Sequence, residues 1–328
     1  MMIRNLFITG FLLLPILLMS QQREEMIPYG DMDQWIVRYI HESKLLGGAT
    51  KTLYAIGPTD TIHENGAYVP IDGNPWGCSN TYAKWIVETA AGGAVQPEPR
   101  LDGYACRMEN KIEHIHFGDM HVMVTGSIFF GQNLEPAGIV AKSKPFTIVD
   151  FGVPFTEHPV ALRLDYKAKI EDSDSVTSTV HNKPEQEPGR DHAEVFVFLQ
   201  HRWEDPKTGK IYARRVGTAS ERIYHDIPEW INNHDIPIRW GDITNDSLFH
   251  SYEQLNKSVM MARNSQGKMV EIEEVGFGLE EPTHAILQIS SSCAGVFRAH
   301  EGNILWVDNL RWVYNDSTNT SHCQTQPK

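Results

Sequence analysis

The sequence predicts an all-β protein, specifically an antiparallel β-jelly-roll or sandwich with long loops and little helix. Most apolar residues recur with period two or in short runs, which is typical of strands. Gly, Pro, Asn and Asp separate these runs and predict turns between neighbouring strands. Hydrophobic residues make up 41% and charged residues 22% of the 328 residues, a composition typical of globular proteins with a packed core.

The first element in chain order is a predicted signal peptide, residues 1–20. Arg4 precedes an apolar run over residues 6–19, and the small residue Ser20 offers a cleavage point before a polar segment. The run is shorter than the roughly 20 residues that span a bilayer, so a retained membrane anchor is the weaker alternative. We therefore expect an exported protein, periplasmic, cell-surface or secreted, with no transmembrane segment after cleavage.

The mature chain is expected to form one large β-domain. Residues 21–69 are predicted to pack on it as an N-terminal segment, residues 70–314 to form the jelly-roll, and residues 315–328 to be a flexible tail. The length permits two domains, but sandwiches of about 250 residues often form a single one. The sequence shows neither an internal repeat nor a linker between two cores.

The strand patterns are spread over the jelly-roll region. Leu162, Leu164 and Tyr166 alternate with polar residues, which predicts one core face and one solvent face. Residues 195–199 are apolar on both faces and predict a central strand. Further strands are predicted over residues 121–130, 285–289 and 304–314.

Two hairpin turns, one loop and one helix complete the predicted elements. Turn-forming residues over 205–210 and 264–268 predict connections between antiparallel strands. The acidic segment 171–191 has almost nothing to bury and is predicted to be a long exposed loop. Residues 246–259 carry apolar side chains at helical spacing behind a capping Asp246, although the same stretch could be irregular. The apolar residues of this face are Leu248, Tyr252, Leu255 and Val259.

The charge balance excludes nucleic acid as a partner. The chain has 42 Asp plus Glu against 29 Lys plus Arg, for a formal net charge of −13. Phosphate binding requires clustered Lys and Arg, and this sequence has no basic stripe.

The four cysteines predict either disulfides or buried thiols. Outside the cytoplasm disulfides can form, and three pairings are open. None of the cysteines has C-x-x-C spacing, so a zinc site built on thiolates is not supported. The four residues are Cys78, Cys106, Cys293 and Cys323.

Several stretches of the sequence contain short motifs that resemble those of a known family. They are residues 74–80 (N-P-W-G-C-S-N), 152–159 (G-V-P-F-T-E-H-P) leading to Leu162 and Tyr166, 199–205 with 212–218, and 290–314, which ends in W-V-D-N-L-R-W-V-Y. The chain resembles the PCMD (putative carbohydrate metabolism domain) family of exported Bacteroidetes proteins, including a Bacteroides subgroup described as glycoside hydrolases. The resemblance implies a β-jelly-roll and a link to glycan metabolism, and it carries over no catalytic residues.

A polar segment between two tryptophans is the predicted ligand-binding site. Exposed aromatic rings stack on the C–H faces of sugars, while amides and charges bind the hydroxyls. Trp230 and Trp240 bracket a polar segment that we expect to be a loop, although burial of both rings as loop anchors is the competing interpretation. The predicted ligand-binding residues are Trp230, Trp240, Asn233, Arg239 and Asp242.

The other tryptophans are expected to be structural. Trp203, Trp306 and Trp312 lie within strand patterns and should belong to the core. Trp76 and Trp85 flank a family motif, and that match favours a structural role over ligand contact.

Histidines and paired acids are the remaining candidates for metal-binding or catalytic groups. His114 and His116, followed by Asp119 and His121, would place two imidazoles on one face of a strand, but solvent-facing histidines fit the pattern better than a cupin-like metal site. Two pairs of adjacent acids cannot be a hydrolytic dyad, because neighbouring strand residues point to opposite faces. These pairs are Glu204-Asp205 and Glu273-Glu274, and the catalytic residues of any hydrolase activity stay unknown.

A structural calcium ion is expected between Asp33 and Asp308, and no cofactor is required. Residues 30–35 resemble the opening of carbohydrate-binding jelly-rolls, where an early acid and an Asp of the closing strand meet around Ca²⁺. The alternative is that Asp308 caps a turn or bonds backbone amides.

The predicted function is glycan recognition by an exported β-jelly-roll protein in carbohydrate metabolism or uptake. A glycoside hydrolase is the first alternative. A structural or adhesive surface subunit is the second, with Asp-Ser tripeptides at Asp174, Asp246 and Asp316 as candidate O-glycan acceptors. The shape of the surface separates the three: acids in a cleft favour hydrolysis, aromatic rings without acids favour binding, and a convex surface favours the structural role.

Overall fold

The computed structural model describes residues 22–44, 48–85, 88–115, 119–138 and 145–315. The predicted signal peptide lies outside these residues, as does the predicted tail beyond Asn315. Regular structure in the described chain is nearly all strand, and the named exceptions are two short 3-10 helices, η2 (Pro145–Ile148) and η3 (Ser251–Glu253). The prediction of an all-β protein with little helix is confirmed. The described residues form no helix of the length and apolarity that a membrane span requires.

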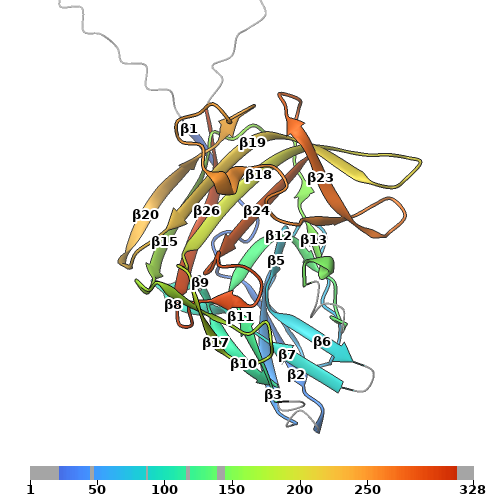
Figure 1. Cartoon of the computed structure of the whole chain (residues 1–328), viewed down its shortest axis with the longest axis vertical. Helices are drawn as coiled ribbons and strands as arrows, with labels where there is room; N and C mark the ends of the chain where they lie inside the picture. Colours follow the sequence, from blue (N-terminus) through green and yellow to red (C-terminus); the bar gives the residue numbers. More distant parts are fainter. Residues whose placement is uncertain (1–21, 45–47, 86–87, 116–118, 139–144, 316–328) are drawn as a thin grey trace, which may run out of the picture.

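The smaller of two large sheets has six strands, all paired antiparallel. Its order is β20 (Ile227–Pro237), β15 (Ala161–Lys169), β26 (Ile304–Asn315), β9 (Gly103–Glu109) and β8 (Val95–Arg100), with β1 (Gln22–Met26) also beside β26. Strands β1 and β26 pair along their length, so the two ends of the described chain lie side by side (Figure 1). The predicted closing strand is therefore central in its sheet.

The larger sheet has ten strands. Its order is β13 (Val149–Phe151), β12 (Ser127–Asn133), β24 (His284–Ser290), β18 (Ala193–Glu204), β19 (Ile211–Ile223), β23 (Met269–Phe277) and β22 (Met261–Arg263), with β5 (Trp76–Cys78) on β12, β14 (Val153–Pro154) on β24 and β21 (Arg239–Trp240) on β19. The predicted turns 205–210 and 264–268 join β18 to β19 and β22 to β23, as expected. The β19–β23 pair is parallel, unlike the other pairs of this sheet.

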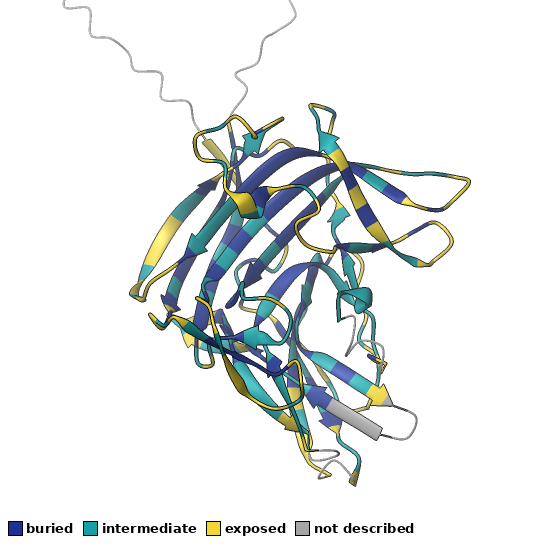
Figure 2. Cartoon of the chain, viewed as in Figure 1, coloured by how far each residue is buried: buried dark blue, intermediate teal, exposed yellow. Residues whose placement is uncertain are grey.

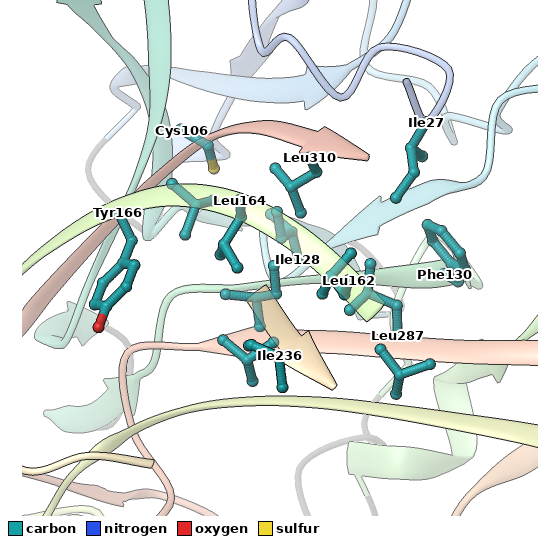
Figure 3. Packing of buried hydrophobic residues seen from close by; sticks show 14 of the residues in the cluster. Ile27, Cys106, Ile128, Phe130, Leu162, Leu164, Tyr166, Ile236, Leu287 and Leu310 are labelled. Atoms are coloured by element: carbon teal, nitrogen blue, oxygen red, sulfur yellow. The ribbon is translucent and has the colours of Figure 1, made fainter. Parts of the chain in front are cut away.

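One core joins the inner faces of the two large sheets. Leu162 and Leu164 of the six-stranded sheet are at most 1% exposed and belong to the same cluster as Ile128 and Leu287 of the ten-stranded sheet (Figure 3). Burying one such side chain contributes roughly 1.5–3 kcal/mol. Figure 2 shows this burial along the long curved strands of both sheets, with exposed residues gathered at loops and hairpin tips.

Four small sheets occupy the lower part of the molecule in Figure 1. They are formed by β2 (Trp35–His41), β3 (Thr50–Ile56) and β4 (Asp60–Ile62); by β6 (Thr81–Trp85) and β7 (Glu88–Gly92); by β10 (Lys111–Ile115) and β11 (Met120–Val124); and by β16 (Ser175–Ser178), β17 (Glu185–Pro188) and β25 (Arg298–Ala299). The predicted N-terminal segment 21–69 thus supplies β1 to a large sheet and β2 to β4 as a sheet of their own.

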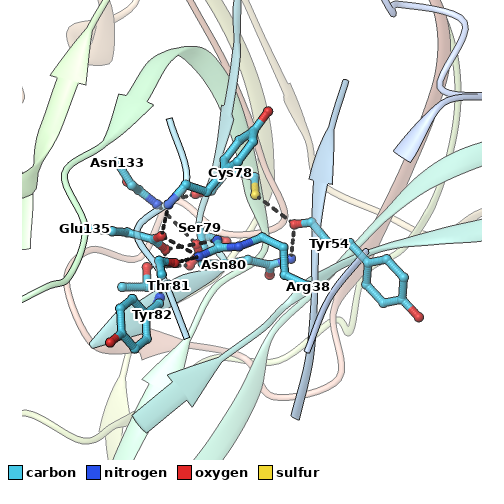
Figure 4. A network of polar contacts seen from close by, with 11 residues as sticks. Arg38, Tyr54, Cys78, Ser79, Asn80, Thr81, Tyr82, Asn133 and Glu135 are labelled. Carbon is cyan, nitrogen blue, oxygen red and sulfur yellow. Dashed lines mark hydrogen bonds and ion pairs between the residues drawn. The ribbon is translucent and has the colours of Figure 1, made fainter. Parts of the chain in front are cut away.

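Buried Glu135 links the small sheets to the strands above them (Figure 4). Its side chain is 2% exposed and accepts a hydrogen bond from Arg38 Nη2 at 2.7 Å. It also accepts bonds from the backbone amides of Tyr68 and Tyr82 at 3.0 and 2.8 Å. Asn80 bonds backbone groups of neighbouring segments in a similar way. A buried carboxylate is tolerated only with such partners in place, so this network fixes the junction.

Two predicted elements are wrong. Residues 246–259 contain only the single turn η3, because Leu248 and Val259 are 65% and 45% exposed and the apolar side chains share no buried face. Asp246 accepts a hydrogen bond from the Leu248 amide in a turn instead of capping a helix. The segment 171–191 is not an open loop, because β16 and β17 form a hairpin within it and β16 also pairs with β25.

The structural tryptophans fall into three groups. Trp312 is 5% exposed in the core, as predicted, and Trp76 is 1% exposed, which confirms its structural role. Trp306 is only half-buried. Trp203 is 40% exposed, so its prediction as a core residue is wrong: β18 continues beyond the core, and the ring stacks on Tyr212 across the hairpin.

The described cysteines are thiols. Cys78, Cys106 and Cys293 are free, while Cys323 lies outside the described residues. Burial raises the pKa of the Cys78 thiol to about 11, which keeps that thiol protonated and unreactive.

Candidate functional site

The ten-stranded sheet carries the main candidate site on the face turned away from the core. Along β18, Val195 and Val197 point into the core, so Glu194 and Phe196 point to the opposite face. The register places Phe196 opposite Gln288 of β24. The same face therefore presents charged, amide and aromatic side chains next to one another.

Two adjoining cavities lie over this face, with volumes of about 240 and 450 Å³. We call them together the sheet groove. They share Glu194, Phe196, Met260 and Cys293 as lining residues. The segment after η3 contributes to the wall of the smaller cavity, and the β10–β11 hairpin contributes to that of the larger.

An ion pair lies where the two cavities meet. Glu194 forms an ion pair with Arg222 of β19 at 3.2 Å. The Arg222 guanidinium lies 4.0 Å from the centre of the Tyr252 ring. Burial raises the pKa of the Glu194 carboxyl, and Arg222 opposes the rise. Glu194 is therefore easier to protonate than an ordinary glutamate.

The larger cavity combines aromatic rings with a few polar groups. Phe129 and Phe151 lie with ring centres 5.5 Å apart, are 3% and 4% exposed, and belong to a second hydrophobic cluster. Phe196 is partly buried, packs against that cluster and lines the same cavity. Gln288 and Ser290 lie among them and can donate or accept hydrogen bonds. Apolar rings beside a few hydrogen-bonding groups are the arrangement that binds sugar rings and their hydroxyls.

The predicted polar loop between Trp230 and Trp240 is wrong, because residues 231–237 belong to strand β20. Ile236 and Ile238 are buried in the core, and β20 is the edge strand of the six-stranded sheet. Its solvent face is polar, which explains why the sequence resembles a loop.

The two tryptophans do not share one surface. Trp230 lies in the six-stranded sheet with the Arg100 guanidinium 3.8 Å from a ring centre, whereas Trp240 lies in the ten-stranded sheet and stacks on His158 at 4.8 Å. Neither ring lines the sheet groove.

The polar residues predicted with them have local partners. The backbone amide of Asn233 donates to Asp165 Oδ1 at 2.7 Å, and the Arg239 guanidinium forms an ion pair with Glu253. Asp242 accepts a hydrogen bond from the Thr244 amide at 2.9 Å in an exposed turn. Ligand binding by these residues stays a prediction.

The two predicted calcium ligands both contact the turn end of the β8–β9 hairpin. Asp33 Oδ1 accepts from the Tyr104 amide at 2.8 Å, while Asp308 is paired with Arg100, which also bonds Asp165 at 3.0 Å. Arg100 thus supplies a positive charge beside Asp308, and Asp308 Oδ1 accepts from the Asn309 amide at 2.7 Å, as the backbone-bonding alternative expects. The calcium ion stays a prediction.

The structure brings three members of the predicted histidine cluster together. His114 of β10 lies directly opposite His121 of β11, and Asp119 Oδ1 lies 2.9 Å from His114 Nε2. His116 lies outside the described residues. His114 and Asp119 are exposed and His121 is half-buried, so solvent-facing histidines describe most of the cluster.

Sequence reasoning missed the sheet groove. The available signal was the alternation of Glu194 and Phe196 with Val195 and Val197, which places an acid and an aromatic ring on one strand face. The partners Arg222 and Gln288 come from other strands, and their proximity depends on pairing that one sequence does not reveal.

Comparison with known proteins gives distant structural neighbours. No family model matches the chain, and no curated protein matches it. A crystal structure of a "putative glycoside hydrolase" from Bacteroides thetaiotaomicron shares 17% identity over 85% of this chain and 70% of that chain, with a TM-score of 0.47. A second "putative glycoside hydrolase", from Bacteroides vulgatus, shares 14% identity over 88% of this chain and 94% of that chain, also with a TM-score of 0.47. Membership of the PCMD family stays a prediction.

Proposed function

We propose that this protein is an exported carbohydrate-binding protein and that its glycan binds in the sheet groove. The observation that carries the proposal is the composition of that groove, where phenylalanine rings lie beside an ion pair and amide groups. A sugar offers apolar C–H faces and a rim of hydroxyls, and it matches such a surface in both respects.

The ion pair gives the groove a means of orienting the ligand. Glu194 accepts hydrogen bonds and Arg222 donates them, so adjacent sugar hydroxyls can bond both at once. Arg222 is held by its stacking on Tyr252, which lowers the conformational entropy lost when a ligand binds. The volume of about 450 Å³ in the larger cavity falls within the range of small-molecule sites.

Glycan-array screening followed by calorimetry tests the proposal. With an identified glycan, Glu194→Gln and Gln288→Ala should each weaken binding by about tenfold or more, since a lost bond to a charged or buried group costs roughly 1.5 kcal/mol. Glu273→Gln, on the exposed side of β23 outside the groove, is the matched control and should bind normally. Normal binding by both groove variants would overturn the proposal.

A glycoside hydrolase is the second candidate, and the raised pKa of Glu194 favours it. Glycosidases need one carboxyl group that is protonated at the working pH, so that it can donate its proton to the leaving-group oxygen. In that case Glu194→Gln should abolish release of reducing sugar while glycan binding persists in part. Unchanged hydrolysis by this variant would exclude Glu194 as the acid.

A further inference from the structure

The β10–β11 hairpin places together three side chains of the types that bind metal ions. His114 and His121 are cross-strand partners, and their rings stack with centres 4.5 Å apart. Asp119 lies next to them, and one ligand atom from each of the three residues lies within 4.8 Å of the other two. Among the described residues, no other three or more His, Cys, Asp or Glu side chains lie close enough together to share a metal ion.

One atom of the cluster lacks the partner that its burial demands. His121 Nδ1 is buried and has no hydrogen-bond partner among the described residues. A buried polar atom left without a partner costs on the order of 1–3 kcal/mol, so such atoms in native proteins call for a ligand, an ion or a water molecule.

The backbone holds His121 in place. Its amide donates to Asn182 O at 2.9 Å, and the amide of Met123 donates to Thr179 Oγ1 at 2.7 Å. The strand β11 is thus fixed on both sides, by β10 and by the segment around Thr179. A metal site benefits from such support, because ligands already held in position lose little entropy on binding.

We propose that His114, Asp119 and His121 bind a divalent transition-metal ion, with Zn²⁺ as the natural occupant. Two imidazoles and one carboxylate are a ligand set that zinc takes at bond lengths of about 2.0–2.2 Å. Calcium collects six to eight oxygen ligands and does not fit it. Tetrahedral zinc places its ligand atoms roughly 3.3 Å apart, so the exposed side chains of His114 and Asp119 close inward on binding.

The site borders the sheet groove, because His114 also lines the larger cavity. Three protein ligands leave one position of a four-coordinate zinc ion open, for water or for an oxygen of a bound ligand. The metal site does not depend on the proposed glycan, since its ligands come from the hairpin alone.

Zinc titration of the untagged protein, in competition with a chromogenic chelator, tests the proposal. We expect one Zn²⁺ per chain, and Asp119→Asn and His114→Ala should each weaken its binding by about tenfold or more. His158→Ala is the matched control: His158 is also exposed and pairs with a carboxylate, Glu281, but belongs to no such cluster, so this variant should bind zinc normally.

Two further measurements keep the result unambiguous. Circular dichroism of each variant shows whether it folds, and both substituted positions are exposed, so we expect native spectra. Cobalt(II) should give the visible absorption of a four-coordinate site in the wild type and lose it in His121→Ala. Absent zinc binding, or binding that survives both Asp119→Asn and His114→Ala, would overturn the proposal.

Discussion

Two aspartates of the six-stranded sheet share one guanidinium. Asp165 and Asp308 lie opposite each other in register, and Arg100 pairs with both. Burial raises the pKa of Asp308 to about 6, although the Arg100 charge opposes the rise. The sequence singled out Asp308, but it did not reveal Arg100, because the two residues are far apart in the chain and meet only through strand pairing.

Asp308→Asn should change how stability depends on pH. The folded protein holds the Asp308 proton more tightly than the unfolded chain, in which the pKa of this carboxyl is 3.8. The protonated carboxyl therefore contributes fully to stability below about pH 3.8, and that contribution is lost as the pH rises through about 6. The free energy of unfolding of the wild type, relative to the variant, should fall by about 3 kcal/mol over this window. Urea unfolding at a series of pH values measures the difference.

The same variant tests the predicted calcium ion. If Asp33 and Asp308 share Ca²⁺, chelator should lower the melting temperature of the wild type and leave Asp308→Asn unaffected. A melting temperature that changes with neither chelator nor added calcium would contradict the calcium prediction. Arg100 would then be the group that balances the charge of Asp308.

At the scale of elements, the periodicity of apolar residues predicts the long core strands. It does not predict strands that have few contacts with the core. The patterns at residues 285–289 and 304–314 correspond to β24 and β26, because both strands bury a regular set of side chains. The sequence of strand β20 resembles a loop, since an edge strand with a polar outer face has little apolar alternation. The hairpin of β16 and β17 was missed because its pairing partner β25 lies more than a hundred residues further along the chain.

Removing the buried carboxylate at the junction of the small sheets should be costly. Glu135→Ala leaves the Arg38 guanidinium buried without its partner and the amides of Tyr68 and Tyr82 without an acceptor. Breaking a buried pair of this kind costs about 3–5 kcal/mol, which urea unfolding would detect as a lower midpoint. Glu64→Ala, at an exposed position, is the control and should change stability by less than about 0.5 kcal/mol. Equal stability of the two variants would show that the network does not fix the junction.

At the scale of the whole molecule, two large sheets share a core, and the other face of the ten-stranded sheet carries both a second hydrophobic cluster and the sheet groove. The all-β class followed from the sequence because period and turn residues are local signals. The groove did not follow, because it is assembled from β12, β18, β19 and β24 together with the segment after η3, and their spatial order is a property of the fold.

The most direct test of the central claim is a crystal structure of the protein with a glycan identified by array screening. The account predicts sugar density in the sheet groove, with rings against Phe196 and hydroxyls within hydrogen-bond distance of Glu194 and Arg222. Density that lies instead on Trp230 or Trp240, with the groove holding no sugar, would contradict it.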